Sequence, residues 1–197
     1  MADALLLLAH GAGAPSSSTW MQAWKTRLQQ LGRVEAFDYP YMQSKRRSPD
    51  PLPKLIAAHR EALHTARANH DGPVFLIGKS MGGRVGCHVA LEEPVTGVIC
   101  MGYPLKGQSG AVRDEVLRKL RVPILFLQGT RDPLCPLDLL AETRKVMTAP
   151  STLLVVESGN HSLEATRTHL KAGQLTQADV DTSILHAIRD FIVKLSV

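Results

Sequence analysis

The sequence predicts an α/β protein with three layers, in which a minimal six-stranded, mainly parallel sheet lies between helices and residues 1–197 form a single domain. Short apolar runs alternate with segments of helical periodicity, a pattern that favours right-handed crossovers and a sheet covered on both faces. A length of 197 residues suits one domain with a substantial core, and 44% hydrophobic and 21% charged residues are typical of soluble globular proteins.

Six short apolar runs rich in branched residues are expected to form buried strands. They are Leu5–Ala9, Val34–Phe37, Val74–Ile77, Gly97–Met101, Ile124–Leu127 and Leu153–Val156. Between the first two runs, apolar residues repeat at helical spacing from Trp20 to Leu31. Ser17 or Ser18 can cap the start of this helix, and Gly32 can end it.

Two later helices have recognisable starts. Asp50 is expected to be the N-cap of the second crossover helix, which carries an apolar face between Leu52 and Leu63. Thr176, with Asp179 three residues later, predicts a capped start for the last helix.

Charge and hydropathy argue against nucleic-acid and membrane partners. The net charge is +5, but the densest basic run, Lys45–Arg47, is only three residues long, which favours a solvated loop over nucleic-acid binding. The most apolar stretch, Ala4–Ala9, is far shorter than the roughly 20 residues of a membrane helix. Asp3 stands where a signal peptide would carry a basic residue, so we expect a cytoplasmic protein without a membrane segment.

The cysteines and histidines predict neither disulfides nor a metal site. Cys87, Cys100 and Cys135 are an odd set without paired spacing. His59 and His64 lie five residues apart rather than four, and no cysteine pair accompanies any histidine.

A serine between two glycines follows the third predicted strand and precedes a plausible helix. Gly78, Ser80 and Gly82 match the nucleophile-elbow pattern in its strand, turn and helix context. Glycine is required on both sides because a sharp, strained turn packs the strand against the helix. Ser80 is therefore the candidate nucleophile, and the alternative is a loop serine that only caps the helix.

A nucleophilic serine needs a base and a carboxylate that orients it, and in this type of fold they follow in the order Ser, Asp, His. Asp132 follows the fifth predicted strand and His161 follows the sixth. We choose Asp132 over Asp138, which falls within the next apolar helical pattern. Asp132 could instead be a simple turn former, and His161 a surface histidine.

Two backbone amides are expected to form an oxyanion hole. One is that of Met81, the residue after the candidate nucleophile, and the other is that of Ala12 in the loop after the first strand. His10 and Gly11 belong to that loop, and we expect His10 to order it rather than to act in catalysis, because one general base suffices.

Other side chains near these motifs are given ordinary roles. Lys79 and Arg84 are expected to line the rim of the site or to face solvent. Trp20 and Trp24 are expected to pack in the core rather than to stack on a ligand.

With these motifs the chain resembles the alpha/beta hydrolases. More narrowly it is similar to a small dienelactone-hydrolase-related group that includes testis-expressed hydrolase-like proteins and the third subunit of the NSL chromatin complex. The residues that carry the resemblance are His10–Gly13, Phe37–Tyr41, Gly78–Arg84, Gly102–Leu105, Gln128–Pro133 and Gly159–His161.

The resemblance implies a serine hydrolase that cleaves an ester or thioester of a small molecule through an acyl-enzyme on Ser80, without a cofactor. Dienelactone hydrolases proper have a cysteine at this position, a departure that argues against their substrate. Only about a dozen residues, 103–114, separate the fourth strand from the next helix, so we expect no lid domain. The alternative function is a non-catalytic binding or scaffold module that keeps the hydrolase fold.

Overall fold

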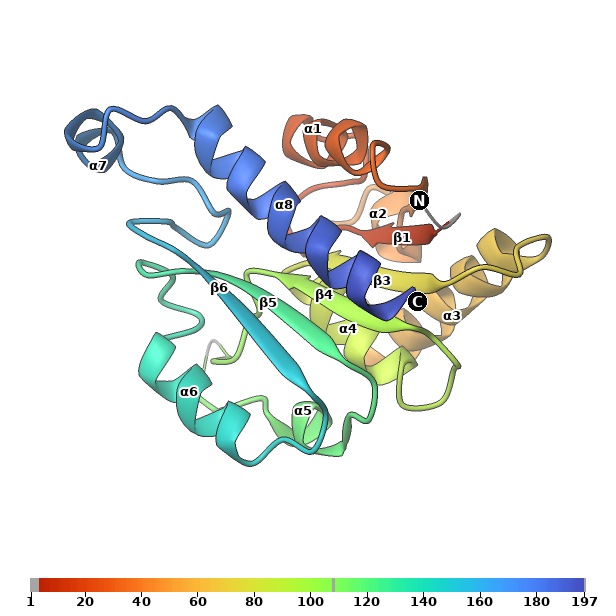
Figure 1. The fold of residues 1–197 in the computed structure, drawn as a ribbon. Coiled ribbons are helices and arrows are strands. Elements are labelled where there is room, and N and C mark those ends of the chain that lie inside the picture. The colour runs from red at the N-terminus through yellow and green to blue at the C-terminus, as the bar shows by residue number, and fades with distance from the viewer. Residues whose placement is uncertain (1–3, 108, 197) are drawn as a thin grey trace.

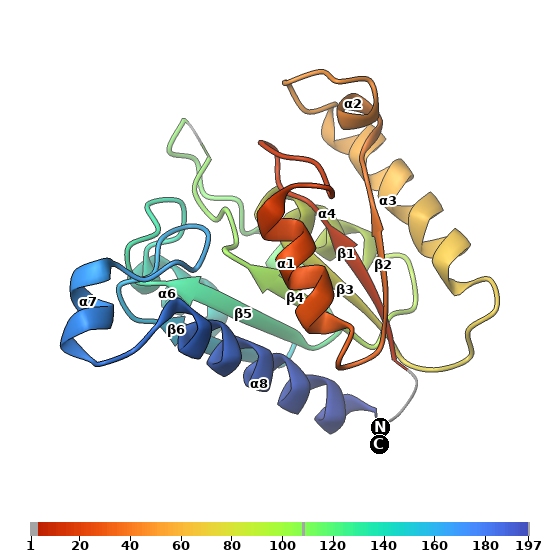
Figure 2. The same ribbon diagram turned by 90° about the horizontal axis from the view of Figure 1, so that it is seen from above.

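A computed structural model describes residues 4–107 and 109–196. Its centre is a six-stranded sheet in the order β2-β1-β3-β4-β5-β6, in which all paired strands are parallel (Figure 1; β2 is labelled in Figure 2). The strands are β1 Leu5–Ala9, β2 Arg33–Phe37, β3 Val74–Lys79, β4 Gly97–Met101, β5 Ile124–Gly129 and β6 Ser151–Val156. All six predicted strands are confirmed, four of them with one or two further residues at an end.

Helices cover both faces of the sheet (Figure 2). They are α1 Thr19–Leu28, α2 Pro40–Gln43, α3 Leu52–Arg67, α4 Met81–Val89, α5 Glu115–Lys119, α6 Leu137–Lys145, α7 Arg167–Ala172 and α8 Gln177–Leu195. Alternate strand residues face opposite layers, so Leu6 and Leu8 pack with α1 and α8, whereas Leu5 and Leu7 pack with the layer that contains α3 to α6. The three-layer α/β architecture is thus confirmed.

The predicted helix starts are partly correct. Thr176 and Asp179 form a reciprocal capping box at the start of α8. The prediction for Asp50 is wrong, because Pro51 occupies the N-cap of α3. The Asp50 carboxylate instead pairs with Arg46 at 2.8 Å and Lys54 at 3.3 Å. Ion pairing has replaced capping at this position.

The predicted limits of the first helix also need correction. Ser18 is the N-cap of α1, but its side chain makes no capping hydrogen bond. The helix ends at Leu28 rather than at Gly32. Gly32 is needed for a different reason, because a Cβ atom there would lie 2.2 Å from the carbonyl oxygen of Ala4. The glycine lets the chain approach the start of β1.

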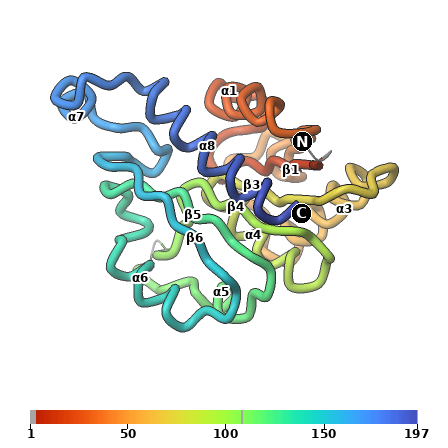
Figure 3. Tube along the Cα trace, viewed as in Figure 1, coloured from red at the N-terminus to blue at the C-terminus, as the bar shows by residue number. Residues whose placement is uncertain are grey.

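The segment between β4 and α5 determines how open the carboxyl edge of the sheet is. Its described residues form no helix or strand, but an isolated bridge joins Lys106 to Val112, and Arg113 donates its backbone N–H to Leu105 at 2.8 Å. The neighbouring elements β4 and α5 are labelled in Figure 3. No lid is evident among the described residues. Within the same ranges, no helix has the length and apolar character needed to cross a membrane.

Candidate active site

Three loops at the carboxyl edge of the sheet bring Ser80, His161 and Asp132 together. Ser80 follows β3, Asp132 follows β5 and His161 follows β6. The Ser80 hydroxyl lies 2.8 Å from Nε2 of His161, and Nδ1 of His161 lies 2.7 Å from Oδ2 of Asp132. Asp138 lies in α6, where its carboxylate accepts the N–H of Leu139. The residue that contacts His161 is therefore Asp132, and the three side chains form one hydrogen-bonded chain.

Ser80 occupies a strained turn between β3 and α4. Its backbone has φ +50° and ψ −115°, a conformation that side-chain-bearing residues rarely adopt. The turn is tight on both sides, because a Cβ atom on Gly78 would lie 2.0 Å from the backbone nitrogen of Gly83. A Cβ atom on Gly82 would lie 2.6 Å from the carbonyl oxygen of Ala9. Only glycine fits these two positions, and the turn lifts Ser80 towards His161.

Asp132 is buried but well satisfied. Its Oδ1 accepts the backbone N–H of Leu134 at 2.9 Å, and its Oδ2 accepts the side-chain N–H of Gln128 at 2.6 Å in addition to bonding His161. Burial raises the pKa of this carboxyl, but the hydrogen bonds from His161, Gln128 and Leu134 outweigh it and leave the pKa below its usual value. Asp132 is therefore ionised at neutral pH and fixed beside the imidazole.

The loop after β1 is ordered by a buried histidine. Nδ1 of His10 donates to the carbonyl oxygen of Gly11 at 2.6 Å, while its Nε2 accepts the backbone N–H of Tyr39 at 3.1 Å. This pattern requires neutral imidazole, and burial correspondingly lowers the pKa of His10. The Tyr41 hydroxyl donates to the carbonyl of Ala12 at 3.1 Å. His10 therefore acts on the loop and does not contact Ser80.

The two amides predicted for the oxyanion hole make no hydrogen bond within the described part of the chain. Neither the backbone N–H of Met81 nor that of Ala12 has an acceptor among the described residues. Met81 follows Ser80 at the first position of α4, and Ala12 lines the same cavity as Ser80.

That cavity, of about 350 Å³, opens between the β1 loop, the start of α1 and the His161 loop. Its lining residues are Gly11, Ala12, Gly13, Ala14, Ser18, Trp20, Met21, Lys79, Ser80, His161 and Ser162. Trp24 is buried in the core as expected, but Trp20 is only partly buried and forms part of the cavity wall. Nε1 of Trp20 donates to the carbonyl of Ser162 at 3.1 Å, which links α1 to the His161 loop.

Of its two expected positions, Lys79 takes the first, because it lines the cavity beside Ser80 and does not face solvent. Its Nζ donates to the backbone carbonyl of His161 and lies 5.4 Å from the centre of the Trp20 ring. Burial lowers the pKa of Lys79 to about 8, although Asp132 and Glu164 favour the charged form. The ammonium group is thus held inside the cavity wall. Arg84, given the same expected role, is half-buried on α4.

Two further residues of the site lie in segments that carry the resemblance, but the sequence patterns assigned neither of them a role. Gln128 orients Asp132, and the only signal for it is a polar residue in an apolar strand. Gly102 has φ +68°, and a Cβ atom there would lie 2.5 Å from the carbonyl oxygen of His161. It is the first residue after β4, where a positive φ has no sequence signal other than glycine itself.

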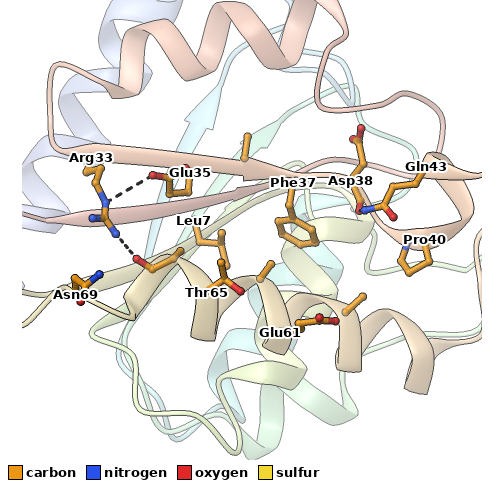
Figure 4. Close-up of a pocket in the computed structure, with 14 residues that line it drawn as sticks. Leu7, Arg33, Glu35, Phe37, Asp38, Pro40, Gln43, Glu61, Thr65 and Asn69 are labelled. Atoms are coloured by element: carbon orange, nitrogen blue, oxygen red, sulfur yellow. Dashed lines mark hydrogen bonds and ion pairs between the residues drawn. The ribbon is translucent and has the colours of Figure 1, made fainter.

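A second, larger cavity of about 590 Å³ lies away from Ser80, between β2 and α3 (Figure 4). Its walls include Arg33, Glu35, Glu61 and Thr65, and Arg33 donates to the carbonyl of Ala66 across it. None of its lining residues belongs to the hydrogen-bonded chain of Ser80, so this cavity is not the candidate active site. Among the described residues, no group of three or more His, Cys, Asp or Glu side chains is placed to hold a metal ion.

An all-parallel sheet with a serine at a sharp turn after its third strand defines an alpha/beta hydrolase fold. The sequence model of a protein family described as "Alpha/beta hydrolase domain" matches residues 2–193 of the chain. The chain therefore belongs to this family.

Solved structures share the fold at low sequence identity. An alpha-beta serine hydrolase homologue from Coxiella burnetii is 15% identical, with a TM-score of 0.71 over 98% of this chain and 84% of the other. Dienelactone hydrolase from Anabaena variabilis is 18% identical, with a TM-score of 0.71 over 100% of this chain and 88% of the other. Est1E from Butyrivibrio proteoclasticus is 15% identical, with a TM-score of 0.67 over 97% of this chain and 87% of the other.

Proposed function

We propose that the protein is a serine hydrolase that cleaves a carboxylic ester or thioester through an acyl-enzyme on Ser80. The observation that carries this proposal is the continuous hydrogen-bonded chain from Asp132 through His161 to Ser80, with spacings of 2.7 Å and 2.8 Å. These distances lie within the range over which a base can remove a proton. We further propose that residues 1–197 form one catalytic domain.

In the first half-reaction, Ser80 Oγ attacks the substrate carbonyl carbon while Nε2 of His161 takes the hydroxyl proton. The carbonyl π electrons move to oxygen, and the amides of Met81 and Ala12 stabilise this oxyanion. When the tetrahedral intermediate collapses, the bond to the leaving oxygen or sulfur breaks and His161 returns the proton to it. Asp132 holds the imidazole and stabilises its charged form.

In the second half-reaction a water molecule replaces the alcohol or thiol. His161 removes a proton from the water, which attacks the acyl carbon, and the same two amides again hold the oxyanion. The bond between Ser80 Oγ and the acyl carbon then breaks, and His161 reprotonates the serine. The products are the carboxylic acid and the free enzyme.

The open site favours small, short-chain substrates, because no lid is evident in the described part of the chain. We place the protein with the small dienelactone-hydrolase-related group that its motifs resemble, among small-molecule hydrolases with a serine instead of a cysteine. A scaffold with the same fold is the competing role, and it has no physical need for a complete chain of three polar groups.

A fluorophosphonate probe with mass-spectrometric mapping tests the proposal. Such a probe reacts rapidly only with a serine that has a base beside it and an oxyanion hole in front of it. We expect one adduct, on Ser80, that is absent in Ser80→Ala and much slower in His161→Ala. Asp132→Asn should reduce ester turnover by up to about 10⁴-fold.

Two results would favour the scaffold instead. One is the absence of labelling in the folded wild-type protein, and the other is labelling at an unchanged rate in His161→Ala.

A further inference from the structure

The wall of the candidate active site contains a cation that the hydrolytic steps do not use. Lys79 is adjacent to Ser80, and both residues line the cavity of about 350 Å³. Nothing in the proton transfers among Ser80, His161 and Asp132 requires an ammonium group there. A charged side chain at the edge of a catalytic cavity loses part of its hydration and calls for compensation.

The described residues around Lys79 compensate the charge of its ammonium group only in part. Lys79 Nζ makes one hydrogen bond, to the carbonyl of His161, and its charge lies 5.4 Å from the centre of the Trp20 ring. An ammonium group has three donors, so two remain for a ligand. Lys79 forms no ion pair with a described carboxylate, and the two nearby carboxylates have other partners, because Asp132 pairs with His161 and Glu164 accepts from Asn160.

From this placement we infer that the cavity selects esters or thioesters that carry a carboxylate, which Lys79 binds while Ser80 attacks the carbonyl. This inference rests on the proposed function, and it adds the charge class of the substrate. The Trp20 ring faces the Lys79 ammonium group from one side, and the His161 carbonyl accepts a hydrogen bond from it on another. The anionic group of the substrate supplies the missing counter-charge.

The test compares matched ester pairs in which a terminal methyl group is replaced by a carboxylate. Monoethyl succinate is compared with ethyl butyrate, and monoethyl glutarate with ethyl valerate, so that the acyl side is varied. Acetoxyacetate is compared with ethyl acetate, so that the alcohol side is varied. For at least one pair we expect the wild-type kcat/KM ratio of anionic to neutral ester to be about 10 to 100, the size of one charge-assisted hydrogen bond.

Substitutions of Lys79 separate charge recognition from positioning. In Lys79→Gln, which keeps a donor for the His161 carbonyl, and in Lys79→Met, the ratio should fall to about 1. Lys79→Arg should keep a ratio well above 1. If Lys79 only positioned the His161 loop, both esters of a pair would slow equally and the ratio would not change. Lys145 is exposed on α6 and paired with Glu142, so Lys145→Met is the matched control and should leave the ratio unchanged.

Failure of this inference can be told apart from failure of the proposed function. If Ser80 accepts the fluorophosphonate and neutral esters are turned over at least as well as every anionic partner, the charge preference is refuted while the hydrolase stands. A preference that persists in folded Lys79→Gln also refutes it. If the variants do not fold, the pH dependence of the wild-type ratio decides, since it needs no substitution.

Discussion

Gln128 donates its side-chain N–H to the same oxygen of Asp132 that binds His161, at a distance of 2.6 Å. The side chains of Gln128 and Asp132 are buried. The side-chain carbonyl of Gln128, Oε1, accepts the backbone N–H of Tyr103 at 3.2 Å. A residue of β5 thus fixes the carboxylate that orients the imidazole, and the loop after β4 fixes that residue in turn.

Removal of this amide is expected to impair turnover without removing any reacting group. Gln128→Leu keeps a similar volume but leaves Asp132 with one hydrogen bond fewer and the Tyr103 N–H without its acceptor. We expect kcat to fall by about 10-fold, the scale of one hydrogen bond to a charged group. Steady-state kinetics with a short-chain nitrophenyl ester measures this fall in kcat. Gln30 is exposed, so Gln30→Leu is the control and should leave kcat unchanged. An unchanged kcat in folded Gln128→Leu would contradict the role of Gln128.

Two glycines with positive φ allow two effects of an alanine substitution to be separated, namely backbone strain and a clash with the His161 carbonyl. Gly102 and Gly110 have φ +68° and +81°, but a Cβ atom would meet the His161 carbonyl at 2.5 Å only at Gly102, whereas nothing described lies within 4 Å of one at Gly110. Both alanine variants should lose about 1 to 2 kcal/mol of unfolding free energy from the conformation alone. Gly102→Ala should also displace His161 and lower kcat by about 100-fold.

Denaturant titration and ester kinetics on the two variants give the answer. Equal kcat values for folded Gly102→Ala and Gly110→Ala would show that the His161 loop does not depend on the space at Gly102.

The preference for anionic esters should depend on pH in a defined direction. Burial lowers the pKa of Lys79 to about 8, against the opposing effects of Asp132 and Glu164. Below that pH the amine is charged and binds a carboxylate, and above it the amine is neutral. The ratio of kcat/KM for an anionic ester to that for its neutral partner should therefore be highest below pH 8 and fall above it.

The other charged or polar groups around Lys79 are Asp132, Glu164 and His161, and taking the ratio cancels the effects that they have on the turnover of both esters. Lys79→Arg should keep its ratio across the same interval, since a guanidinium stays protonated. A wild-type ratio that is level or rises between pH 7 and pH 9 would exclude Lys79 as the group that recognises the anion.

The short segment between β4 and α5 leaves the Ser80 site accessible, and we therefore expect soluble esters to be hydrolysed without interfacial activation. Short-chain nitrophenyl esters should give a rate that saturates smoothly with concentration, because no described residue forms a cap that has to open before Ser80 is reached. A sudden rise in rate above the critical micelle concentration of the substrate would reveal a mobile cover. The measurement is an initial-rate series that extends across that concentration.

The strands and the order of the three polar site residues could be predicted from the sequence, and the physical reason is burial. A parallel sheet covered on both faces demands apolar runs such as Ile124–Leu127, and residues that directly follow such runs must lie at one edge. The short helices α2 and α7 were not predicted, since segments of four and six residues depend on tertiary contacts more than on their own propensity.

Side-chain direction was the other limit. A lysine after an apolar strand can face water or a cavity, and for Lys79 the choice depends on Trp20 and the His161 carbonyl, which distant parts of the chain supply. Asp50 illustrates the same limit, because a residue that suits an N-cap also suits ion pairs with Arg46 and Lys54.

The backbone angles of Ser80 imply that reactivity and conformational stability are opposed at this one residue. A serine held at this sparsely populated combination of φ and ψ costs of order 1 to 3 kcal/mol, whereas a glycine adopts a positive φ readily. Ser80→Gly should therefore abolish ester turnover yet raise the midpoint of chemical denaturation, and a lower midpoint would show that the serine is relaxed there. Searches for stabilised variants of this protein that do not also assay activity would tend to select inactive molecules at position 80.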